Sequence, residues 1–478
     1  VLPVILFHAG IELFSGGFVG VDIFFVISGY LITTIILSEM NLGQFSLLNF
    51  YERRARRILP ALFLVMFCSL PFAWLWLTPE HLKDFSQSLV AVVTFSSNIL
   101  FWRESGYFGT ASELKPLLHT WSLAVEEQYY ILFPLFLISI WKVRKRWILG
   151  ALILVAFSSM LIAQFGAYRY VTATFFLLPT RGWELAIGAV IAFFIVYKTE
   201  NHKLLTASNL INNIMSFTGI GLIGYAVFYF DNSIPFPSFY ALVPTVGAAL
   251  LIIFAKPSNV IGELLGTKPL VGFGLVSYSL YLWHQPILAF AKHRSMDSPS
   301  PALLVFLLLV SLFFAILSWK FVEIPFRNKA RFTRKMIFFY AGIASLFFAT
   351  IGIAGHFTGG FSSRIDSRYF SIAQPVSGRL AGCEEEVVLY DGSTCTIGKA
   401  NSTPSIALLG DSHSTRITKQ LGDAADTVGA SIVVYSQSWC PPLLDIATNN
   451  PGKRPSCRTF MTSALNDVAS NRAINTVI

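Results

Sequence analysis

Charged side chains are scarce in this sequence. Asp, Glu, Lys and Arg together make up 13% of its 478 residues, whereas hydrophobic types make up 54%. A soluble protein of this length needs far more charge to cover its surface, so that class is excluded for most of the chain. Up to residue 355, apolar residues form blocks of about 18–22 residues, long enough to cross a hydrocarbon core of about 30 Å. After His356 the composition becomes that of an ordinary soluble domain.

Three further features are absent. The sequence has no initiating Met and no evident signal peptide, because it starts at Val1 inside an apolar run. It also ends at Ile478, within what reads as the start of a strand, so we expect a fragment whose first span serves as the insertion signal. The net charge is +9, but the basic residues lie in short clusters between apolar blocks and form no continuous basic face. Nucleic acid is therefore excluded as a partner.

The apolar blocks predict a polytopic α-helical membrane bundle of about eleven spans. They lie near residues 1–9, 18–38, 58–77, 122–141, 147–165, 174–196, 214–230, 238–254, 270–291, 302–319 and 335–354. The Ser-rich segment 86–102 is apolar but interrupted, which is typical of a re-entrant or interfacial helix. Lys and Arg are concentrated in one alternate set of loops, including 53–57, 142–146 and 327–335. The positive-inside rule places these loops in the cytoplasm, and an odd number of spans then places the tail outside.

Cysteine is also rare, with five in the whole chain. Cys68 lies in an apolar span and is most simply a small buried residue. The other four, Cys383, Cys395, Cys440 and Cys457, all fall in the tail, where an oxidising compartment would favour two disulfides. Three connectivities are possible, and proximity in sequence favours Cys383–Cys395 with Cys440–Cys457; four unrelated thiols are the alternative.

The tail divides into a linker and extension at 356–404 and an α/β segment at 405–478. Residues 405–409 predict a buried parallel strand, 414–429 a helix, and 432–435 a second strand. Gly410-Asp411-Ser412-His413 follows the first strand directly. A serine at the carboxyl end of a parallel strand, where a helix begins, is exposed at the edge of the sheet. Helix-terminal amides at that place can stabilise an oxyanion, so Ser412 is a candidate nucleophile. The alternative is a serine that caps a helix.

This segment resembles the first block of the SGNH (GDSL-like) hydrolase family. The resemblance implies that Ser412 is the nucleophile and that its amide helps to form the oxyanion hole. The family's catalytic Asp and His lie in an Asp-x-x-His motif near the end of the domain, and the sequence stops before such a motif. His413 does not match the family's base. The expected domain is therefore the truncated N-terminal part of an SGNH-like fold.

Polar groups within the spans are costly in lipid and are candidates for function. They are His8, Asp22, His119, Trp121, Ser122, Glu126, Glu127, Gln128, Arg181, Glu184, Tyr281 and His284. Each of them alone is more often a structural hydrogen-bond partner, but together they indicate a polar cavity that binds substrate or forms a pore. The spacing of Arg181 and Glu184 predicts an ion pair on one helix face. The pattern predicts no metal site.

Several stretches of the bundle resemble the acyltransferase-3 family of membrane proteins, which includes bacterial O-antigen and peptidoglycan O-acetyltransferases. The matching stretches are 20–32 (GVDIFFVISGYLI), 50–60 (FYERRARRILP), 119–128 (HTWSLAVEEQ), 278–286 and 322–327 (VEIPFR). The resemblance covers about residues 1–355, and fusion to an outward SGNH-like domain is a known arrangement in this family. The Arg that members carry upstream of the first-span His is not in this sequence.

The resemblance implies an O-acyltransferase of the bacterial inner membrane, with its C-terminal domain in the periplasm. Acetyl-CoA is the expected donor, and no permanently bound cofactor is expected. Guanidinium groups suit its phosphates, so the cytoplasmic Arg53, Arg54, Arg56 and Arg57 are its candidate site; a topogenic basic loop is the other interpretation.

His8 is expected to act as general base or nucleophile, assisted by Glu126 or Glu127. Ser412 would then pass the acyl group to a cell-envelope polysaccharide or lipid-linked glycan such as O-antigen.

Two other classes of function fit parts of the pattern. A transporter for a glycan or small molecule, with the tail as a binding module, would also need charges inside the membrane. A membrane-anchored carbohydrate esterase would use the bundle only as an anchor. The arginine loop and the serine turn favour the acyltransferase over the transporter, and the many polar residues within the spans argue against a passive anchor.

Overall fold

The chain forms two separate units, Val1–Ser362 and Ser363–Ile478. The structure, a computed structural model, describes residues 1–105, 112–198, 208–231, 233–295, 299–364, 395–399, 402–411, 414, 417–437 and 457–478. The expected boundary after the last span, near residue 355, falls close to the division between the units.

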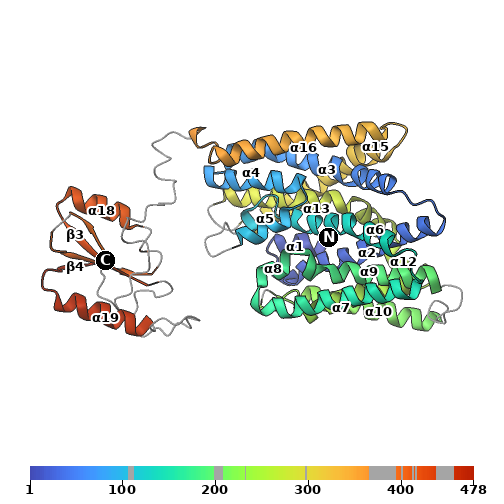
Figure 1. The fold of residues 1–478 in the computed structure, drawn as a ribbon, viewed down its shortest axis with the longest axis horizontal. Coiled ribbons are helices and arrows are strands. Elements are labelled where there is room, and N and C mark those ends of the chain that lie inside the picture. The colour runs from blue at the N-terminus through green and yellow to red at the C-terminus, as the bar shows by residue number, and fades with distance from the viewer. Residues whose placement is uncertain are drawn as a thin grey trace. The chain divides into compact units, whose positions relative to one another are not determined.

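The first unit is a bundle of helices (Figure 1). Its α-helices are α1 (Leu2–His8), α2 (Gly20–Asn41), α3 (Leu47–Trp76), α4 (Pro79–Val93), α5 (Ser97–Glu104), α6 (Thr120–Ile140), α7 (Lys145–Arg169), α8 (Val171–Phe176), α9 (Leu178–Lys198), α10 (Asn209–Tyr229), α11 (Leu242–Phe254), α12 (Val260–Leu265), α13 (Lys268–Arg294), α14 (Pro301–Ser318), α15 (Ile324–Arg327) and α16 (Arg334–Phe357). A π-helical turn, Trp319–Glu323, joins α14 to α15. The expected helical membrane bundle is therefore confirmed as a fold class.

Eight helices in the described part of the chain are long and apolar enough to cross a membrane. The expected count of eleven is not confirmed. Three expected spans correspond to helices that miss these criteria: α1 has seven residues, α11 has 13, and α13 has 27 but contains the polar run 277–279 and the pair His284-Gln285.

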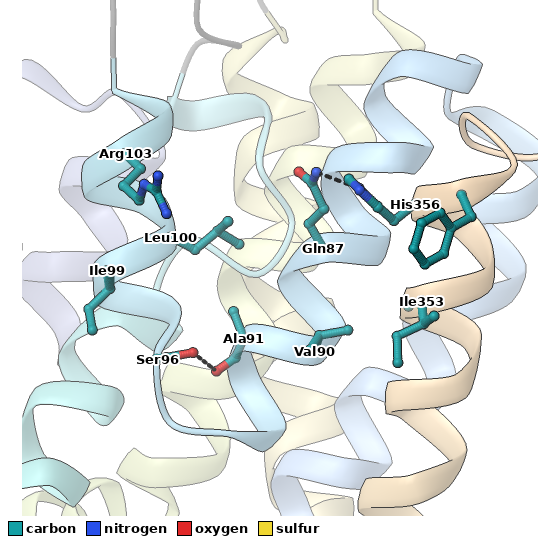
Figure 2. A pocket seen from close by; sticks show the side chains of 11 residues that line it. Gln87, Val90, Ala91, Ser96, Ile99, Leu100, Arg103, Ile353 and His356 are labelled. Carbon is teal, nitrogen blue, oxygen red and sulfur yellow. Dashed lines mark hydrogen bonds between the residues drawn. The ribbon is translucent and has the colours of Figure 1, made fainter.

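The interrupted segment expected at 86–102 is a pair of helices, α4 and α5, separated by a tight turn. Phe95 in this turn has φ of +52°, a left-handed conformation that is strained for a residue with a Cβ. Gln128 stabilises the turn, because its Nε2 donates to the Phe95 carbonyl over 2.9 Å. The Ser96 amide returns to the Ala91 carbonyl at the end of α4, so α5 starts beside it (Figure 2).

Helices α2 and α9 cross in backbone contact. A Cβ added at Gly29 would lie 1.9 Å from the Leu185 carbonyl oxygen, and one at Gly188 would lie 2.1 Å from that of Val26. Only glycine permits this approach, which is the close packing that small residues give membrane helices. The crossing brings Asp22 of α2 next to Arg181 of α9.

The second unit is a mixed sheet with helices on both faces. Its elements are β1 (Cys395–Gly398), β2 (Ile406–Gly410), α18 (Thr418–Thr427), β3 (Ser431–Ser436), α19 (Cys457–Ser470) and β4 (Thr476–Val477), with strand order β1-β3-β2-β4. β2 is parallel to β3 and β4, whereas β1 is antiparallel to β3. Alternate residues of β2 and β3 pack with α19 on one face and α18 on the other. The expected strand–helix–strand order is confirmed, although α18 begins four residues later than expected.

The cysteines of the described residues agree with disulfides in the tail only. Cys395 and Cys457 each take part in a disulfide, and Cys68 is free. Cys383 and Cys440 lie outside the described residues, so the pairing of the four remains a prediction.

Replacing Gly29 by Val should destabilise the bundle, because the new side chain meets the backbone of α9. We expect a cost of at least about 1–3 kcal/mol, the usual range for overpacking. The measurement is the thermal unfolding midpoint in detergent. Gly221→Val in α10 is the matched control, since a Cβ there has nothing within 4 Å. Equal midpoints for the two variants would contradict backbone contact between α2 and α9 at Gly29.

Candidate active site

Three histidines from distant parts of the sequence meet inside the bundle. His8 ends α1, His119 directly precedes α6, and His284 lies in α13. The His8 and His284 rings are nearly parallel, with centroids 5.2 Å apart and planes 6° from parallel, and the His119 ring centroid lies 5.6 Å from that of His284. No group of His, Cys, Asp and Glu in the described residues has an arrangement that would hold a metal ion. The three imidazole rings can take part in acid–base or nucleophilic chemistry.

The hydrogen bonds of His284 fix the tautomers of the pair. Its Nδ1 lies 2.6 Å from the Tyr281 carbonyl oxygen, which only accepts, so Nδ1 carries the proton. In the neutral ring, Nε2 of His284 is then an acceptor, and it lies 3.0 Å from Nδ1 of His8. His8 therefore donates from Nδ1, and its lone pair is on Nε2. A histidine oriented in this way is ready to act as base or nucleophile at Nε2.

Tyr281 and Ser122 hold the His119 end of the site. The Tyr281 hydroxyl donates to the His119 carbonyl over 2.9 Å, and the Ser122 hydroxyl lies 2.7 Å from the Tyr281 oxygen. His119 is 1% exposed, and neither of its ring nitrogens has a hydrogen-bond partner within the described ranges. A buried imidazole without partners is costly, so this ring is available to contact a substrate.

A buried charge cluster lies beside the site. Arg181 is 1% exposed, and its Nη1 lies 3.2 Å from Glu184 and 3.3 Å from Asp22, both fully buried. The ion pair expected from the Arg181 and Glu184 spacing is present, and Asp22 extends it. The guanidinium also lies over the rings of Trp121 and Phe25, at 5.6 and 5.4 Å. This cluster joins α9 to α2 and α6, which supports the site without contacting the histidines.

Glu126 and Glu127 lie further along α6 than the histidines. Glu126 follows His119 by seven residues, a rise of about 10 Å, and its Oε1 accepts from Ser28 over 2.6 Å. Glu127 is 8% exposed, and its Oε1 has no hydrogen-bond partner in the residues that the structure describes. No hydrogen bond found there joins either carboxyl to His8, so which of them assists it remains a prediction. Both interact electrostatically with Arg54.

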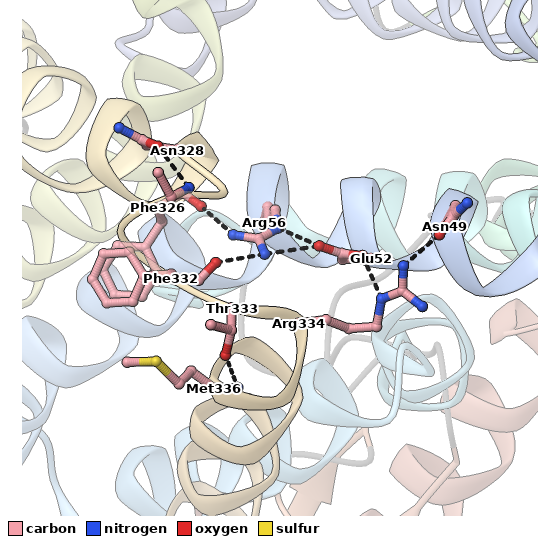
Figure 3. Close-up of polar contacts among 10 residues, drawn as sticks. Asn49, Glu52, Arg56, Phe326, Asn328, Phe332, Thr333, Arg334 and Met336 are labelled. Carbon is pink, nitrogen blue, oxygen red and sulfur yellow. Dashed lines mark hydrogen bonds and ion pairs between the residues drawn. The ribbon is translucent and has the colours of Figure 1, made fainter.

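The four arginines of the basic loop have different environments. Arg56 is 3% exposed; it pairs with Glu52 over 2.7 Å and donates to the carbonyls of Phe326 and Phe332 (Figure 3). Arg334 pairs with the same Glu52 over 2.6 Å. Arg56 therefore joins α3 to α15 and to the loop after it, and has a structural role.

The other three arginines are more accessible. Arg53 pairs with Glu39 over 2.8 Å. Arg54 lies over the Tyr130 ring, and its Nε is buried without a hydrogen-bond partner among the described residues. Arg57 is exposed and makes no ion pair in the described part of the chain. Arg54 and Arg57 are therefore the best placed of the four to bind an anionic ligand.

The second unit places Gly410 and Asp411 at the carboxyl end of β2. Ser436, at the end of β3, donates from its hydroxyl to the Asp411 carbonyl over 2.8 Å, and the Ser414 hydroxyl donates to the same oxygen over 2.7 Å. A Cβ at Gly410 would lie 2.6 Å from the Ser414 Cβ, so this turn requires glycine. Ser412 and His413 lie outside the described residues. The turn is at the strand edge where α/β folds bind ligands.

Burial raises the pKa of the Tyr435 phenol in the same unit, and its hydrogen bond to Asp467 raises it further. Tyr435 therefore stays protonated and donates to that carboxylate, which ties β3 to α19.

Sequence analysis missed two groups near the bundle interior. Ser28 contacts Glu126, and Glu323 accepts from Ser279 over 2.5 Å and from Arg327 over 2.6 Å. Both lie inside the stretches 20–32 and 322–327 that carry the family resemblance, so their position in a motif was the available signal. Glu323 holds α13 against the π-helical turn.

Comparison with known proteins gives one family match in each of the two units. The acyltransferase domain family matches residues 2–320, and the family described as the SGNH domain fused to AT3 domains matches residues 382–478. The O-acetyltransferase OatA of Staphylococcus aureus (strain NCTC 8325 / PS 47) is 32% identical over 342 residues, which is 69% of this chain and 56% of the relative. The putative O-acetyltransferase SACOL0978 of Staphylococcus aureus (strain COL) is 32% identical over 345 residues, with the same shares. The chain thus spans about half the length of these relatives, and no solved structure matches.

Replacing Arg56 by Gln should destabilise the bundle more than replacing Arg57 by Gln. Arg56→Gln removes one of two partners of a buried carboxylate and two carbonyl contacts, for which we expect a cost of about 2 kcal/mol or more. Arg57→Gln changes an exposed side chain and should cost less than about 0.5 kcal/mol. Thermal unfolding in detergent measures both. An equal loss for the two would contradict the separate roles assigned here.

Proposed function

Because the chain belongs to the acyltransferase family that matches residues 2–320, with an SGNH domain behind it, we propose that it is a membrane O-acyltransferase. It moves an acetyl group from cytoplasmic acetyl-CoA across the membrane to hydroxyls of an extracytoplasmic cell-envelope glycan such as O-antigen. The names of the relatives, O-acetyltransferases, support the reaction type. The observation that carries the proposal is the His8–His284 pair, which leaves a lone pair on His8 inside an apolar bundle.

Donor binding is assigned to the cytoplasmic end of α3. Arg54 and Arg57 supply positive charge there for the phosphates of coenzyme A. The Tyr278 hydroxyl donates to the carbonyl of Ile58, the residue after Arg57, over 2.8 Å. Tyr278 lies six residues before His284 in α13, a rise of about 9 Å. A pantetheine arm is long enough to cover such a distance, so the thioester can reach His8 while the nucleotide stays at the arginines.

The first transfer uses His8 as nucleophile. Its Nε2 attacks the thioester carbonyl carbon, the C–S bond breaks, and the thiolate leaves. The Nδ1 proton passes to His284 Nε2, which neutralises the acylated ring, and this proton later returns when the acyl group moves on. An apolar surrounding protects the activated acyl group from hydrolysis, because water is excluded.

The second transfer is assigned to the SGNH domain. The hydroxyl oxygen of Ser412 attacks the acyl carbon, the bond to His8 Nε2 breaks, and the serine proton passes to solvent. An acceptor hydroxyl of the glycan then attacks the acyl carbon, the bond to the serine oxygen breaks, and the acceptor proton passes to that oxygen. The Gly410 turn supports this step, because it lies at the carboxyl edge of parallel strands and Ser412 follows two positions later in the sequence. The confinement of donor and acceptor to opposite sides of the membrane explains why the reaction needs both domains.

Membrane vesicles that contain the full-length protein test this relay. Acetyl-CoA labelled in the acetyl group is supplied on the cytoplasmic side only, and label on outer-face glycan is measured. We expect wild type to label the glycan, and both His8→Ala and Ser412→Ala to reduce the label at least about 100-fold, since each removes a covalent carrier.

The two variants also separate the steps. Ser412→Ala should retain label on the protein, whereas His8→Ala should retain none. Normal glycan labelling in both variants would reject the relay and favour a transporter or an anchored esterase. An esterase would also release acetate from glycan that was acetylated beforehand.

Replacing His284 tests its role in orienting His8. His284→Leu removes the acceptor for the His8 Nδ1 proton, so we expect kcat to fall about 100-fold. His284→Gln keeps an acceptor oxygen and should recover part of this loss, with little change in KM for acetyl-CoA. Equal activity of Leu and Gln variants at wild-type thermal stability would exclude the orienting role.

A further inference from the structure

A trough on the side of the bundle, lined by none of the histidines of the candidate active site, has the form of a lipid site. It has a volume of about 390 Å³ and lies between α4, α5 and α16. The turn at Phe95 creates it, because α5 starts back beside α4 and leaves a channel between the two helices and α16. Gly352 narrows the gap between α16 and α4, since a Cβ there would lie 2.5 Å from the Ser86 carbonyl oxygen.

The lining of the trough is mostly apolar, with Ser96 at the turn between α4 and α5 and a larger group of polar side chains at the other end (Figure 2). Its walls are formed by Val90, Ala91, Ile99, Leu100, Ile353 and Phe357. Near the end where α5 and α16 finish, the side chains of Gln87 and His356 are in contact, and Arg103 lies across the trough from them on α5. The apolar walls thus match a lipid acyl chain, and the polar end matches a lipid headgroup.

The polar end is suited to an anion. Nε2 of the Gln87 amide donates to Nδ1 of His356 over 2.8 Å, so the remaining ring proton of neutral His356 is on Nε2. Arg103 lies in the last turn of α5, but within the described residues its guanidinium makes no hydrogen bond to the helix carbonyls and no ion pair. An arginine and an imidazole N–H at one site match a phosphate oxygen group.

The apolar part determines the rest of the ligand. Phe357 is 83% exposed and Ile353 49% exposed, on a helix that is long and apolar enough to cross a membrane. This surface faces hydrocarbon when α16 spans the bilayer, so a water-soluble phosphate would leave the trough unfilled. A lipid acyl chain in the trough places its headgroup at Arg103.

We propose that this trough binds an anionic phospholipid, with one acyl chain between α4, α5 and α16 and its phosphate held by Arg103 and His356. The site does not depend on the acyl-transfer reaction proposed above. It gives Arg103 a partner at the bilayer surface and anchors α5, the helix that precedes the His119 segment, to the lipid phase.

Native mass spectrometry of the purified full-length protein tests the site by titration with dioleoyl phosphatidylglycerol. We expect one lipid to bind to the wild-type protein. Arg103→Gln should lower the affinity about tenfold, because it removes one charge-assisted contact. Arg169→Gln is the matched control, because Arg169 is an exposed arginine in the last turn of α7, outside the trough. It should bind like wild type.

Two further arms identify the ligand. Zwitterionic phosphatidylcholine should bind less tightly than phosphatidylglycerol, and soluble glycerol 3-phosphate should not compete. Leu100→Trp, which narrows the trough and leaves every charge in place, should lower lipid affinity even if Arg103→Gln fails to fold. Equal affinities of Arg103→Gln and Arg169→Gln, or full competition by glycerol 3-phosphate, would overturn the proposal.

Discussion

The cost of burying charge governs the interior of this bundle. An ionic group surrounded by hydrocarbon is tolerated only when other groups of the protein compensate it. Arg181 shows how this is met: two carboxylates from α2 and α9 contact its guanidinium, and aromatic rings from α2 and α6 surround it. The glycines that let α2 and α9 meet are part of the same solution, because a wider crossing would separate Asp22 from Arg181.

The same constraint prepares the histidines for chemistry. His284 is fully buried and His8 is partly buried, so the nitrogens of these two rings have few possible partners. His284 uses the carbonyl of Tyr281 in its own helix, and that choice leaves only its Nε2 to accept from His8. The lone pair on His8 is therefore a consequence of how α13 satisfies His284, and the reactive atom is defined before any substrate binds.

Sequence reasoning located these groups but could not arrange them. A histidine or carboxyl in an apolar block is visible at once, so His8, His119 and His284 were all identified. Their contact joins residues 276 positions apart, and no local pattern specifies it. Likewise the four arginines of one loop look equivalent in the sequence, yet Arg56 faces carbonyls of α15 and of the loop after it whereas Arg57 faces outward. Which arginine is buried depends on how α3 is rotated about its axis against the neighbouring helix, and this is set by tertiary packing.

The expected span count is not confirmed, and the physical reason is related. Hydropathy finds segments that face lipid, whereas a helix enclosed by other helices is free to carry polar groups. α13 is such a helix: its residues 279–286 are all buried, and they include Ser279, which bonds Glu323, and His284. Part of the site is thus supplied by a helix that does not meet the criteria for a membrane span. Low hydropathy within an otherwise apolar bundle is therefore itself a sign of function, provided that the polar residues have partners on neighbouring helices.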